Sequence, residues 1–262
     1  MAHFTTVYHG DILPNGMVPL HTSQGQELLQ KTTKKNKIVV NDFKPQIGDT
    51  NCGPTSLALV LNAINSFHVK LSDPDLTDTE YEILMEKMND DKELILTELD
   101  IINHGKVKDY FRDINIEKNG MTLLQLGHVA TRLGYGVNTY FAYNNSIEIS
   151  EDKKSEFNDL ISSPTFHTLE TSSDFEALVE NRIRRPVTGV ILNYDMSKLG
   201  YTSFPGHHSP IGALNDEMIL VMDVWKQTKP AWVDKKLLFD AMSTVDSDCG
   251  FPRGLLHIHE LL

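Results

Sequence analysis

The chain contains two cysteines, and one of them, Cys52, is placed where a thiol can act as a nucleophile. It lies in PQIGDTNCGPTSLALVLNAI, where a polar, glycine-containing loop runs into an almost unbroken apolar stretch from Ser56 to Ile64. Pro54 suits the first turn of a helix, so the pattern predicts a helix that begins beside Cys52. The N–H groups at a helix N-terminus lower the pKa of a thiol, because they favour the thiolate that attacks.

A cysteine nucleophile needs a base, and most of the eleven histidines in the chain have a simpler explanation. They lie in polar segments, among helical apolar residues or on a terminal strand. His207 and His208 differ, because FPGHHSPIG places them between a glycine turn and a predicted strand, where a side chain can project into a cleft. Asp223 ends the apolar run MILVMD, so its carboxylate needs a partner such as an imidazole on a neighbouring strand.

Cys52, a histidine of this pair and Asp223 predict a triad of nucleophile, base and orienting acid for acyl transfer or hydrolysis. A cysteine, a histidine and an aspartate occur in this order along many chains by chance. Such chemistry also needs hydrogen-bond donors for the oxyanion of the tetrahedral intermediate. The backbone N–H of Cys52 and the side-chain amide of Gln46 would serve if the loop between them folds back. A solvent-exposed loop glutamine is the alternative.

Two other groups that could do chemistry have weaker support. His257 and His259 alternate on a predicted strand and could bind a metal, but no third ligand is near them in the sequence. Cys249 lies in the turn-like DSDCGFP, where nothing activates it, so we expect a spectator thiol. We therefore predict no metal site and no tightly bound cofactor.

The elements that must position these groups follow from the hydrophobic patterns. Helical patterns are QGQELLQKTTKKNK, TDTEYEILMEKM, ILTELDIINHGKVKDYF, MTLLQLGHVATRLG, SSDFEALVENRI and LLFDAMSTV. Strand patterns are PVTGVILNY, HHSPIGALN, MILVMDVW and GLLHIHEL. The polar segment 144–165 is expected to be a loop or surface insertion. Helices followed by a sheet predict an α+β fold with two lobes, in a single domain over residues 1–262.

Composition limits the partners. The chain has 24 lysine and arginine residues against 36 aspartate and glutamate residues, a net charge of −12 that repels phosphate backbones and anionic lipids. We therefore expect no nucleic acid and no membrane as partner. The N-terminus lacks a signal-peptide pattern, and no stretch approaches the roughly 18 apolar residues of a membrane span. These features predict a cytoplasmic protein, with export by a signal-independent route left open.

Four segments of the chain, in order, resemble those of the phytochelatin synthases, papain-like enzymes that use glutathione. SQGQELLQ resembles the family's Ser-Gln-Gly helix start, and PQIGDTNCGPTSLALVLNAI resembles its nucleophile segment, which matches Gln46 and Cys52 to the oxyanion-hole glutamine and the catalytic cysteine. GHHSPIG resembles Gly-His-Phe-Ser-Pro-Ile-Gly and selects His207 rather than His208 as the catalytic histidine. The segment that begins MILVMDVWKQTKPAWV places the catalytic aspartate on Asp223.

The resemblance implies a papain-like fold with a helical N-terminal lobe and an antiparallel-sheet C-terminal lobe. It also implies that Cys52 attacks the Cys–Gly bond of glutathione, releases glycine and forms a γ-glutamylcysteinyl thioester. Water then gives γ-glutamylcysteine, or a second glutathione gives a phytochelatin. Cadmium or zinc would stimulate the reaction as thiolate complexes of the substrate.

The resemblance places substrate-binding roles on Asn51, Gly206, Lys226 and Arg253. Plant members have tyrosine before the nucleophile and arginine three residues after the aspartate, where this chain has Asn51 and Lys226. Lysine keeps the charge but loses the bidentate fork for a carboxylate. The cysteine-rich C-terminal region of the plant enzymes has no counterpart in this sequence, so the chain resembles the short bacterial members, regarded mostly as glutathione hydrolases. Hydrolysis is therefore expected to dominate.

Two other readings stay open. The same triad could cleave a protein substrate, as in a papain-like peptidase or isopeptidase. A non-catalytic, metal-responsive scaffold that keeps the fold is the other alternative. A homodimer is compatible with all of these readings.

Overall fold

The computed structural model describes residues 13, 16–72, 96–144, 146–183, 188–201 and 206–260, without side chains for residues 67–72. The helix predicted at TDTEYEILMEKM lies outside these residues. None of the helices in the described ranges has the length and apolar character that crossing a membrane requires.

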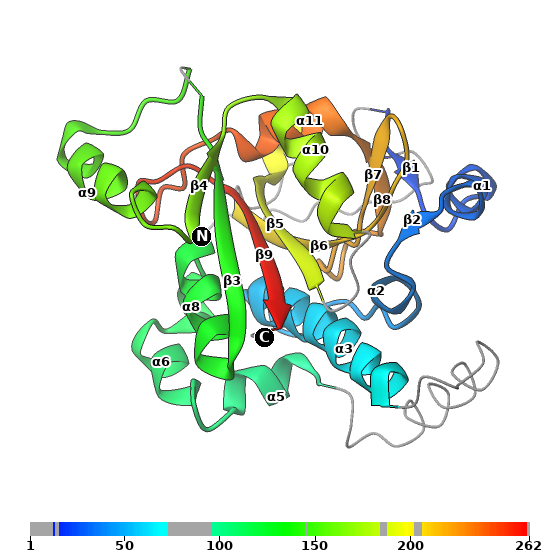
Figure 1. Cartoon of the computed structure of the whole chain (residues 1–262), viewed down its shortest axis with the longest axis horizontal. Helices are drawn as coiled ribbons and strands as arrows, with labels where there is room; N and C mark the ends of the chain where they lie inside the picture. The colour runs from blue at the N-terminus through cyan, green and yellow to red at the C-terminus, as the bar shows by residue number, and fades with distance from the viewer. Residues whose placement is uncertain are drawn as a thin grey trace.

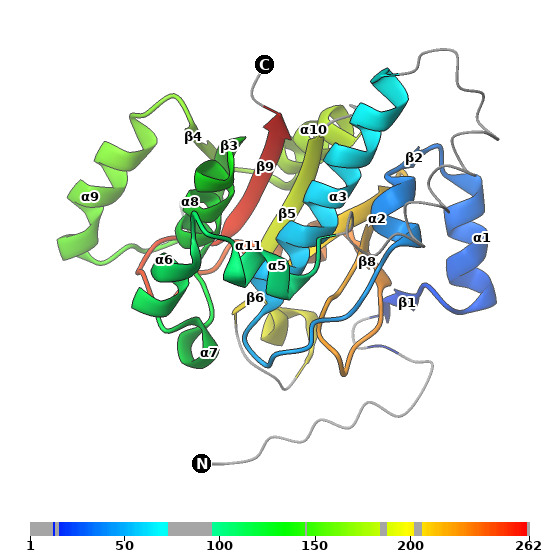
Figure 2. The ribbon, with the colours of Figure 1, turned by 90° about the horizontal axis from the view of Figure 1, so that it is seen from below.

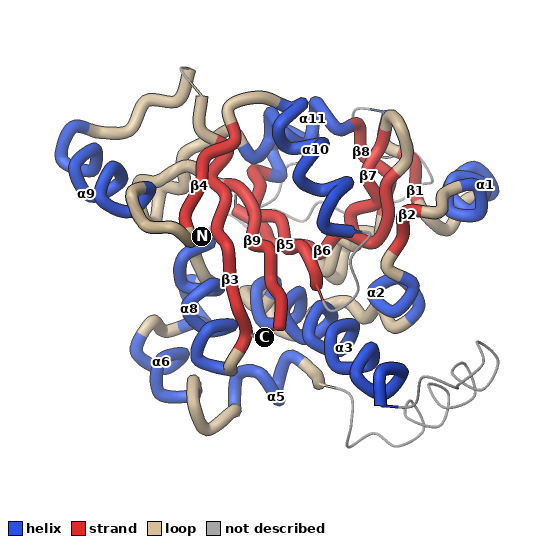
Figure 3. The backbone as a smooth tube through the Cα atoms, viewed as in Figure 1, coloured by secondary structure: helices blue, strands red, loops and turns tan. Residues whose placement is uncertain are grey.

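One sheet runs through the molecule (Figure 1, Figure 3). Among the described residues it has the strand order β1-β8-β7-β6-β5-β9-β3-β4, with β2 paired to β6. Its neighbours are antiparallel, except that β3 and β4 are parallel. The strands are β1 (Val18–Pro19), β2 (Lys34–Lys35), β3 (Tyr135–Ala142), β4 (Phe166–Leu169), β5 (Thr188–Asp195), β6 (Gly206–Leu214), β7 (Met218–Val221), β8 (Ala231–Asp234) and β9 (Gly254–Glu260).

Helices cover both faces of this sheet. Helices α3, α5, α6 and α8 lie on one face and α10 and α11 on the other (Figure 1, Figure 2). The helices are α1 (Ser23–Lys31), α2 (Lys37–Asn41), α3 (Cys52–Ser72), α5 (Glu98–Asn103), α6 (Lys108–Asp113), α7 (Ile116–Asn119), α8 (Leu123–Leu133), α9 (Glu151–Ile161), α10 (Ser172–Ile183) and α11 (Lys235–Met242), with a short 3₁₀ helix at Met196–Leu199.

The central strands are apolar on both faces, because each face packs against helices. In β5, Ile191 joins the apolar cluster of α3, α5 and α8, whereas Val190 and Leu192 join the cluster of α10 and α11. Helix α3 approaches β5 so closely that a Cβ at Gly189 would overlap the side chain of Val60. Glycine at this position therefore lets the helix that begins with Cys52 lie directly on the sheet.

The predicted α+β class is confirmed, with helices dominating the first part of the chain and antiparallel strands the second. Strands β5, β6, β7 and β9 and helices α3, α8, α10 and α11 overlap the segments that predicted them, although several of their ends differ. That the whole chain is a single domain stays a prediction.

Several elements were not expected from the sequence pattern, and α9 and β3 are the two longest of them. The segment 144–165 is not only a loop, because it contains α9, a helix on the surface. Its one buried residue, Phe157, packs against Phe141, Tyr143 and Phe251, and a single apolar contact cannot produce a helical stripe in the sequence. Strand β3 was missed as well; it pairs with β9 on one side and, across the α9 connection, with the parallel strand β4 on the other.

Candidate active site

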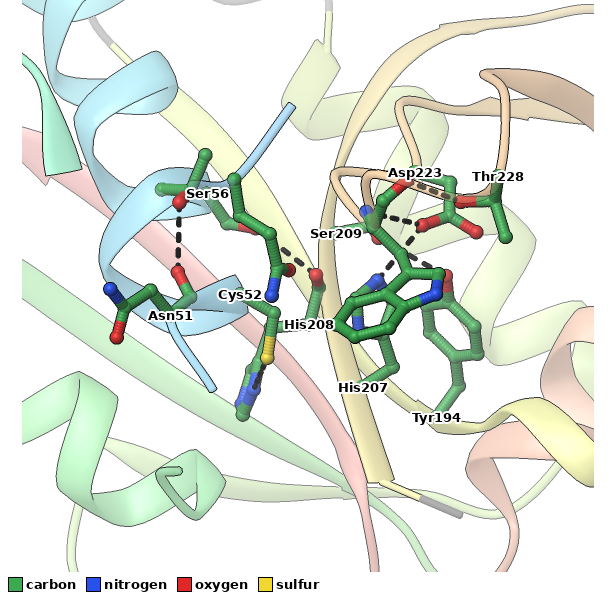
Figure 4. Close-up of polar contacts among 12 residues, drawn as sticks. Asn51, Cys52, Ser56, Tyr194, His207, His208, Ser209, Asp223 and Thr228 are labelled. Atoms are coloured by element: carbon green, nitrogen blue, oxygen red, sulfur yellow. Dashed lines mark hydrogen bonds and ion pairs between the residues drawn. The ribbon is translucent and has the colours of Figure 1, made fainter. Parts of the chain in front are cut away.

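Cys52 is the first residue of α3, as the sequence predicted. The residue is partly exposed, whereas residues 53–64, which follow it in α3, are buried. The Ser56 hydroxyl donates a hydrogen bond to the backbone carbonyl of His208 at 3.2 Å, which ties the first turn of α3 to β6 (Figure 4). The sulfur therefore lies at the positive end of the helix dipole and beside the strand that carries the two histidines.

His207 and Asp223 form a buried pair. The distance from His207 Nε2 to Asp223 Oδ1 is 2.9 Å, and each residue is 4% exposed. The backbone N–H of Trp225 donates to the same carboxylate oxygen at 2.9 Å, and the ring of Tyr194 packs edge-on against the imidazole. Because a carboxylate only accepts hydrogen bonds, Nε2 of His207 carries a proton and Nδ1 is left to exchange protons with other groups.

His208 also contacts the nucleophile. Its Nδ1 lies 3.8 Å from Cys52 Sγ, and Figure 4 shows the sulfur directed toward the His208 ring. Its Nε2 lies 3.2 Å from Nδ2 of Asn193, a buried residue of β5. The resemblance selected only His207, and Asn193 was not among the predicted residues. An asparagine inside the apolar run VILNY was the available signal, since a buried amide needs a partner.

The electrostatics of the site favour a thiolate–imidazolium pair. Burial raises the pKa of Cys52, but interactions with His207 and His208 hold it well below its usual value. Burial also disfavours the charged form of His207, but the charge and hydrogen bond of Asp223, with those of Cys52, raise the pKa of His207 to about 10. The direction of both shifts thus favours the thiolate of Cys52 beside a protonated His207.

Gln46 lies beside the segment that carries Asp223, as expected if the loop between Gln46 and Cys52 folds back. Its backbone N–H donates to the carbonyl of Val224 at 2.8 Å, and its Nε2 donates to Gly48 O at 2.7 Å. The residue is buried, so the alternative of a solvent-exposed glutamine is wrong. The second N–H of Nε2 remains for an oxyanion, and this role stays a prediction.

Glu98 holds the loop that leads to the nucleophile, and sequence reasoning did not identify it. Its carboxylate accepts four hydrogen bonds, from Ile47 N at 2.8 Å, Gly48 N at 3.0 Å, Asn51 Nδ2 at 2.9 Å and Thr55 Oγ1 at 2.7 Å. Burial raises the pKa of Glu98, but these hydrogen bonds lower it below its usual value. The sequence around Glu98 carries one recognisable pattern, the Thr97–Asp100 capping box. That pattern predicts the start of a helix but does not indicate that Glu98 binds the loop before Cys52.

The four predicted substrate-binding residues surround the triad in different ways. Asn51 turns its amide away from the sulfur (Figure 4). Its Nδ2 donates a hydrogen bond to Glu98 Oε1. Lys226 forms an exposed ion pair with Asp49 of the nucleophile loop. Gly206 directly precedes His207, and a Cβ there would lie 3.4 Å from Nη2 of Arg253, so these two residues are neighbours.

Arg253 is a buried cation at this edge of the site. It donates through Nη1 to Val245 O at 2.6 Å and to Thr244 Oγ1 at 3.2 Å, and Nη2 lies 3.9 Å from Asp246. Its Nε is buried and has no hydrogen-bond partner among the residues that the structure describes. A substrate role for these residues stays a prediction.

His257, His259 and the second cysteine lie apart from this chemistry. His257 and His259 stack with ring centroids 5.2 Å apart on β9. Within the described ranges, no group of three or more His, Cys, Asp or Glu side chains is arranged to hold a metal ion. Cys249 packs against the apolar cluster of α3, α5 and α8, and burial raises its pKa, the opposite direction to Cys52.

Comparisons with known proteins point to one family. A sequence model of the phytochelatin synthase family matches residues 8–255. Glutathione gamma-glutamylcysteinyltransferase 3 of Lotus japonicus is 38% identical over 94 residues, 35% of this chain and 19% of that protein. The glutathione gamma-glutamylcysteinyltransferase of Schizosaccharomyces pombe is 30% identical over 143 residues, 53% of this chain and 28% of that protein. The aligned part thus spans less than a third of either relative.

The solved structures that the chain resembles include the peptidase domain of Streptococcus ComA, a bifunctional ABC transporter involved in a quorum-sensing pathway. The match covers 84% of this chain and 98% of that domain, with 13% sequence identity and a TM-score of 0.35. This likeness is too low to support an argument about function.

Proposed function

Because the chain belongs to the phytochelatin synthase family, we propose that it cleaves the Cys–Gly amide bond of glutathione by acyl transfer to Cys52. The observation that carries the proposal is the position of the Cys52 sulfur, at the start of α3 and against an imidazole of β6, with His207 bonded to Asp223. A low thiol pKa beside a protonated histidine is the state that attacks an amide and can then protonate its leaving group.

The proposed reaction has two steps. The Cys52 thiolate attacks the scissile carbonyl, and the oxyanion is stabilised by the backbone N–H of Cys52 and the second N–H of Gln46 Nε2. His207 donates its proton to the leaving amine of glycine, the C–N bond breaks and a γ-glutamylcysteinyl thioester forms. Neutral His207 then accepts a proton from water, which releases γ-glutamylcysteine, or from the amino group of a second glutathione, which gives a phytochelatin.

We further propose that water is the main acceptor and that metal ions act on the substrate as thiolate complexes. The two positions that differ from the plant members support the first point, because Asn51 is buried and bonded to Glu98, and Lys226 offers an ammonium without the bidentate fork of arginine. An acceptor glutathione therefore finds neither the tyrosine nor the arginine of those enzymes at these places.

A product assay tests the proposal. Purified protein is incubated with glutathione, with and without cadmium, and the products are separated and identified by mass spectrometry. We expect glycine and γ-glutamylcysteine in equal amounts and few longer peptides, with no turnover by Cys52→Ser. The matched control Cys249→Ser removes the other thiol and should keep full activity. Absence of all these products, or equal turnover by Cys52→Ser, would refute the proposal.

A further inference from the structure

The nucleophile is contacted by an imidazole that the triad does not use. His208 is 1% exposed, its Nδ1 lies 3.8 Å from Cys52 Sγ, and its backbone carbonyl accepts the Ser56 hydroxyl. Strand β6 therefore holds the His208 ring against the sulfur, which is itself carried by the first residue of α3. The resembling family segment has phenylalanine at this position, so the resemblance assigns His208 no role.

The neighbours of Asn193 determine which nitrogen of His208 carries the proton. Nδ2 of Asn193 lies 3.4 Å from the backbone oxygen of His207 and 3.2 Å from Nε2 of His208. A carbonyl oxygen can only accept, so the NH₂ end of the amide must face it. The opposite orientation would set two oxygens against each other and leave the buried NH₂ group without an acceptor, since no described residue pairs with Oδ1.

With the amide in this orientation, Asn193 donates one N–H to the His207 carbonyl and the other to Nε2 of His208. Nε2 is then the unprotonated nitrogen, and the single proton of the neutral ring sits on Nδ1, which faces the sulfur. The partner of each ring thus sets its chemistry. The acceptor Asp223 leaves Nδ1 of His207 able to take a proton, whereas the donor Asn193 makes Nδ1 of His208 a fixed donor.

We propose that His208 is a second catalytic residue, a neutral imidazole whose Nδ1–H donates a hydrogen bond to the Cys52 thiolate, and that Asn193 is the residue that positions it. This inference rests on the proposed cysteine chemistry and assigns different roles to two adjacent histidines. His207 exchanges protons with the leaving group and the acceptor. His208 stabilises the negative sulfur before attack and again when the thioester breaks and the thiolate leaves.

The pH dependence of Cys52 alkylation tests this inference without glutathione. Iodoacetamide labelling rates are measured from pH 4 to 10 by mass spectrometry of the Cys52 peptide, and the midpoint of the profile gives the thiol pKa. His208→Phe keeps a ring of similar shape but has no N–H. It should raise the midpoint by about one to two units, the effect of losing a hydrogen bond to a charged group.

His208→Asn is the matched rescue variant, because its Nδ2 occupies nearly the place of the imidazole Nδ1 and donates as well. Its midpoint should lie closer to wild type than that of His208→Phe, which a purely structural role would not produce. An unchanged midpoint in His208→Phe, or an equal rise in both variants, would overturn the inference.

Glutathione turnover separates this inference from the proposed function. In His208→Phe, kcat/KM should fall about 10-fold or more at neutral pH and recover as the pH rises above the new thiol pKa. Loss of activity at every pH, with an unshifted alkylation midpoint, would instead make His208 the base. If wild type cleaves no glutathione but the alkylation midpoints shift as expected, the proposed function fails and the role of His208 stands.

Discussion

Glu98→Gln should loosen the loop that leads to the nucleophile, although Glu98 itself belongs to α5. The side chain is 5% exposed, and its two carboxylate oxygens divide the donors between them. Oε2 accepts from Ile47 N and Thr55 Oγ1, and Oε1 accepts from Gly48 N and Asn51 Nδ2. Each oxygen thus faces one backbone N–H, which cannot reverse its direction.

The magnitude follows from this geometry. Glutamine has the same shape but replaces one oxygen by NH₂, so in either orientation an NH₂ group meets a backbone N–H of the loop. The Thr55 hydroxyl can rotate to accept, so the best orientation places NH₂ at the Oε2 position and loses the bond to Ile47. One lost hydrogen bond to a charge, with the remaining ones no longer charge-assisted, corresponds to about 3 kcal/mol of unfolding free energy.

The assay is urea denaturation at pH 7 and at acidic pH, with Glu117→Gln as control, an exposed glutamate in the first turn of α7. The folded pKa of Glu98 is lowered, so its contribution to stability is complete above the unfolded value of about 4.3 and is lost as the pH falls through the folded value. The difference between wild type and Glu98→Gln should therefore shrink below about pH 4. A loss below about 0.5 kcal/mol at pH 7, or one that does not change with pH, would refute the reasoning.

Three further predictions concern the site. Asp223→Asn should move the alkaline limb of the kcat/KM profile to lower pH, because the charge and hydrogen bond of Asp223 are the largest of the interactions that raise the pKa of His207; a limb that does not move would exclude that cause. Gln46→Ala should lower kcat by about 10²-fold while iodoacetamide still labels Cys52 at the wild-type rate, as expected for an oxyanion donor. Asp49→Ala, which removes an exposed ion pair, should change the unfolding free energy by no more than about 1 kcal/mol, measured in urea.

The sequence predicted those parts of the site that depend on local pattern. The helix that begins at Cys52 follows from Pro54 and an apolar run, and both are local signals. His207 and Asp223 were found because each lies at the end of a strand pattern in a short segment. Their pairing depends on the antiparallel ladder of β6 and β7, which the adjacency of the two strands in the chain made predictable.

The contacts that the sequence did not reveal join distant segments. Glu98 and the loop it holds are about 50 residues apart, and Asn193 is 15 residues from His208 on the antiparallel partner strand. A glutamate in a helix start and an asparagine in a strand have no pattern that names such a partner. Only the register of β5 against β6, which pairs Asn193 with His208, brings the amide to the imidazole.

Asn51 and Lys226, the two residues that differ from the plant members, have partners that a substrate would displace at different cost. Lys226 is paired with Asp49 at the surface, and an exposed pair of this kind contributes about 0 to 1 kcal/mol, so a substrate carboxylate can take the place of Asp49 at little cost. Asn51 is buried and donates to a charged carboxylate, a bond whose loss costs about 1.5 to 3 kcal/mol. Lys226 therefore remains available as a substrate contact, whereas the side chain of Asn51 is engaged with Glu98 and helps to fix the loop that precedes Cys52.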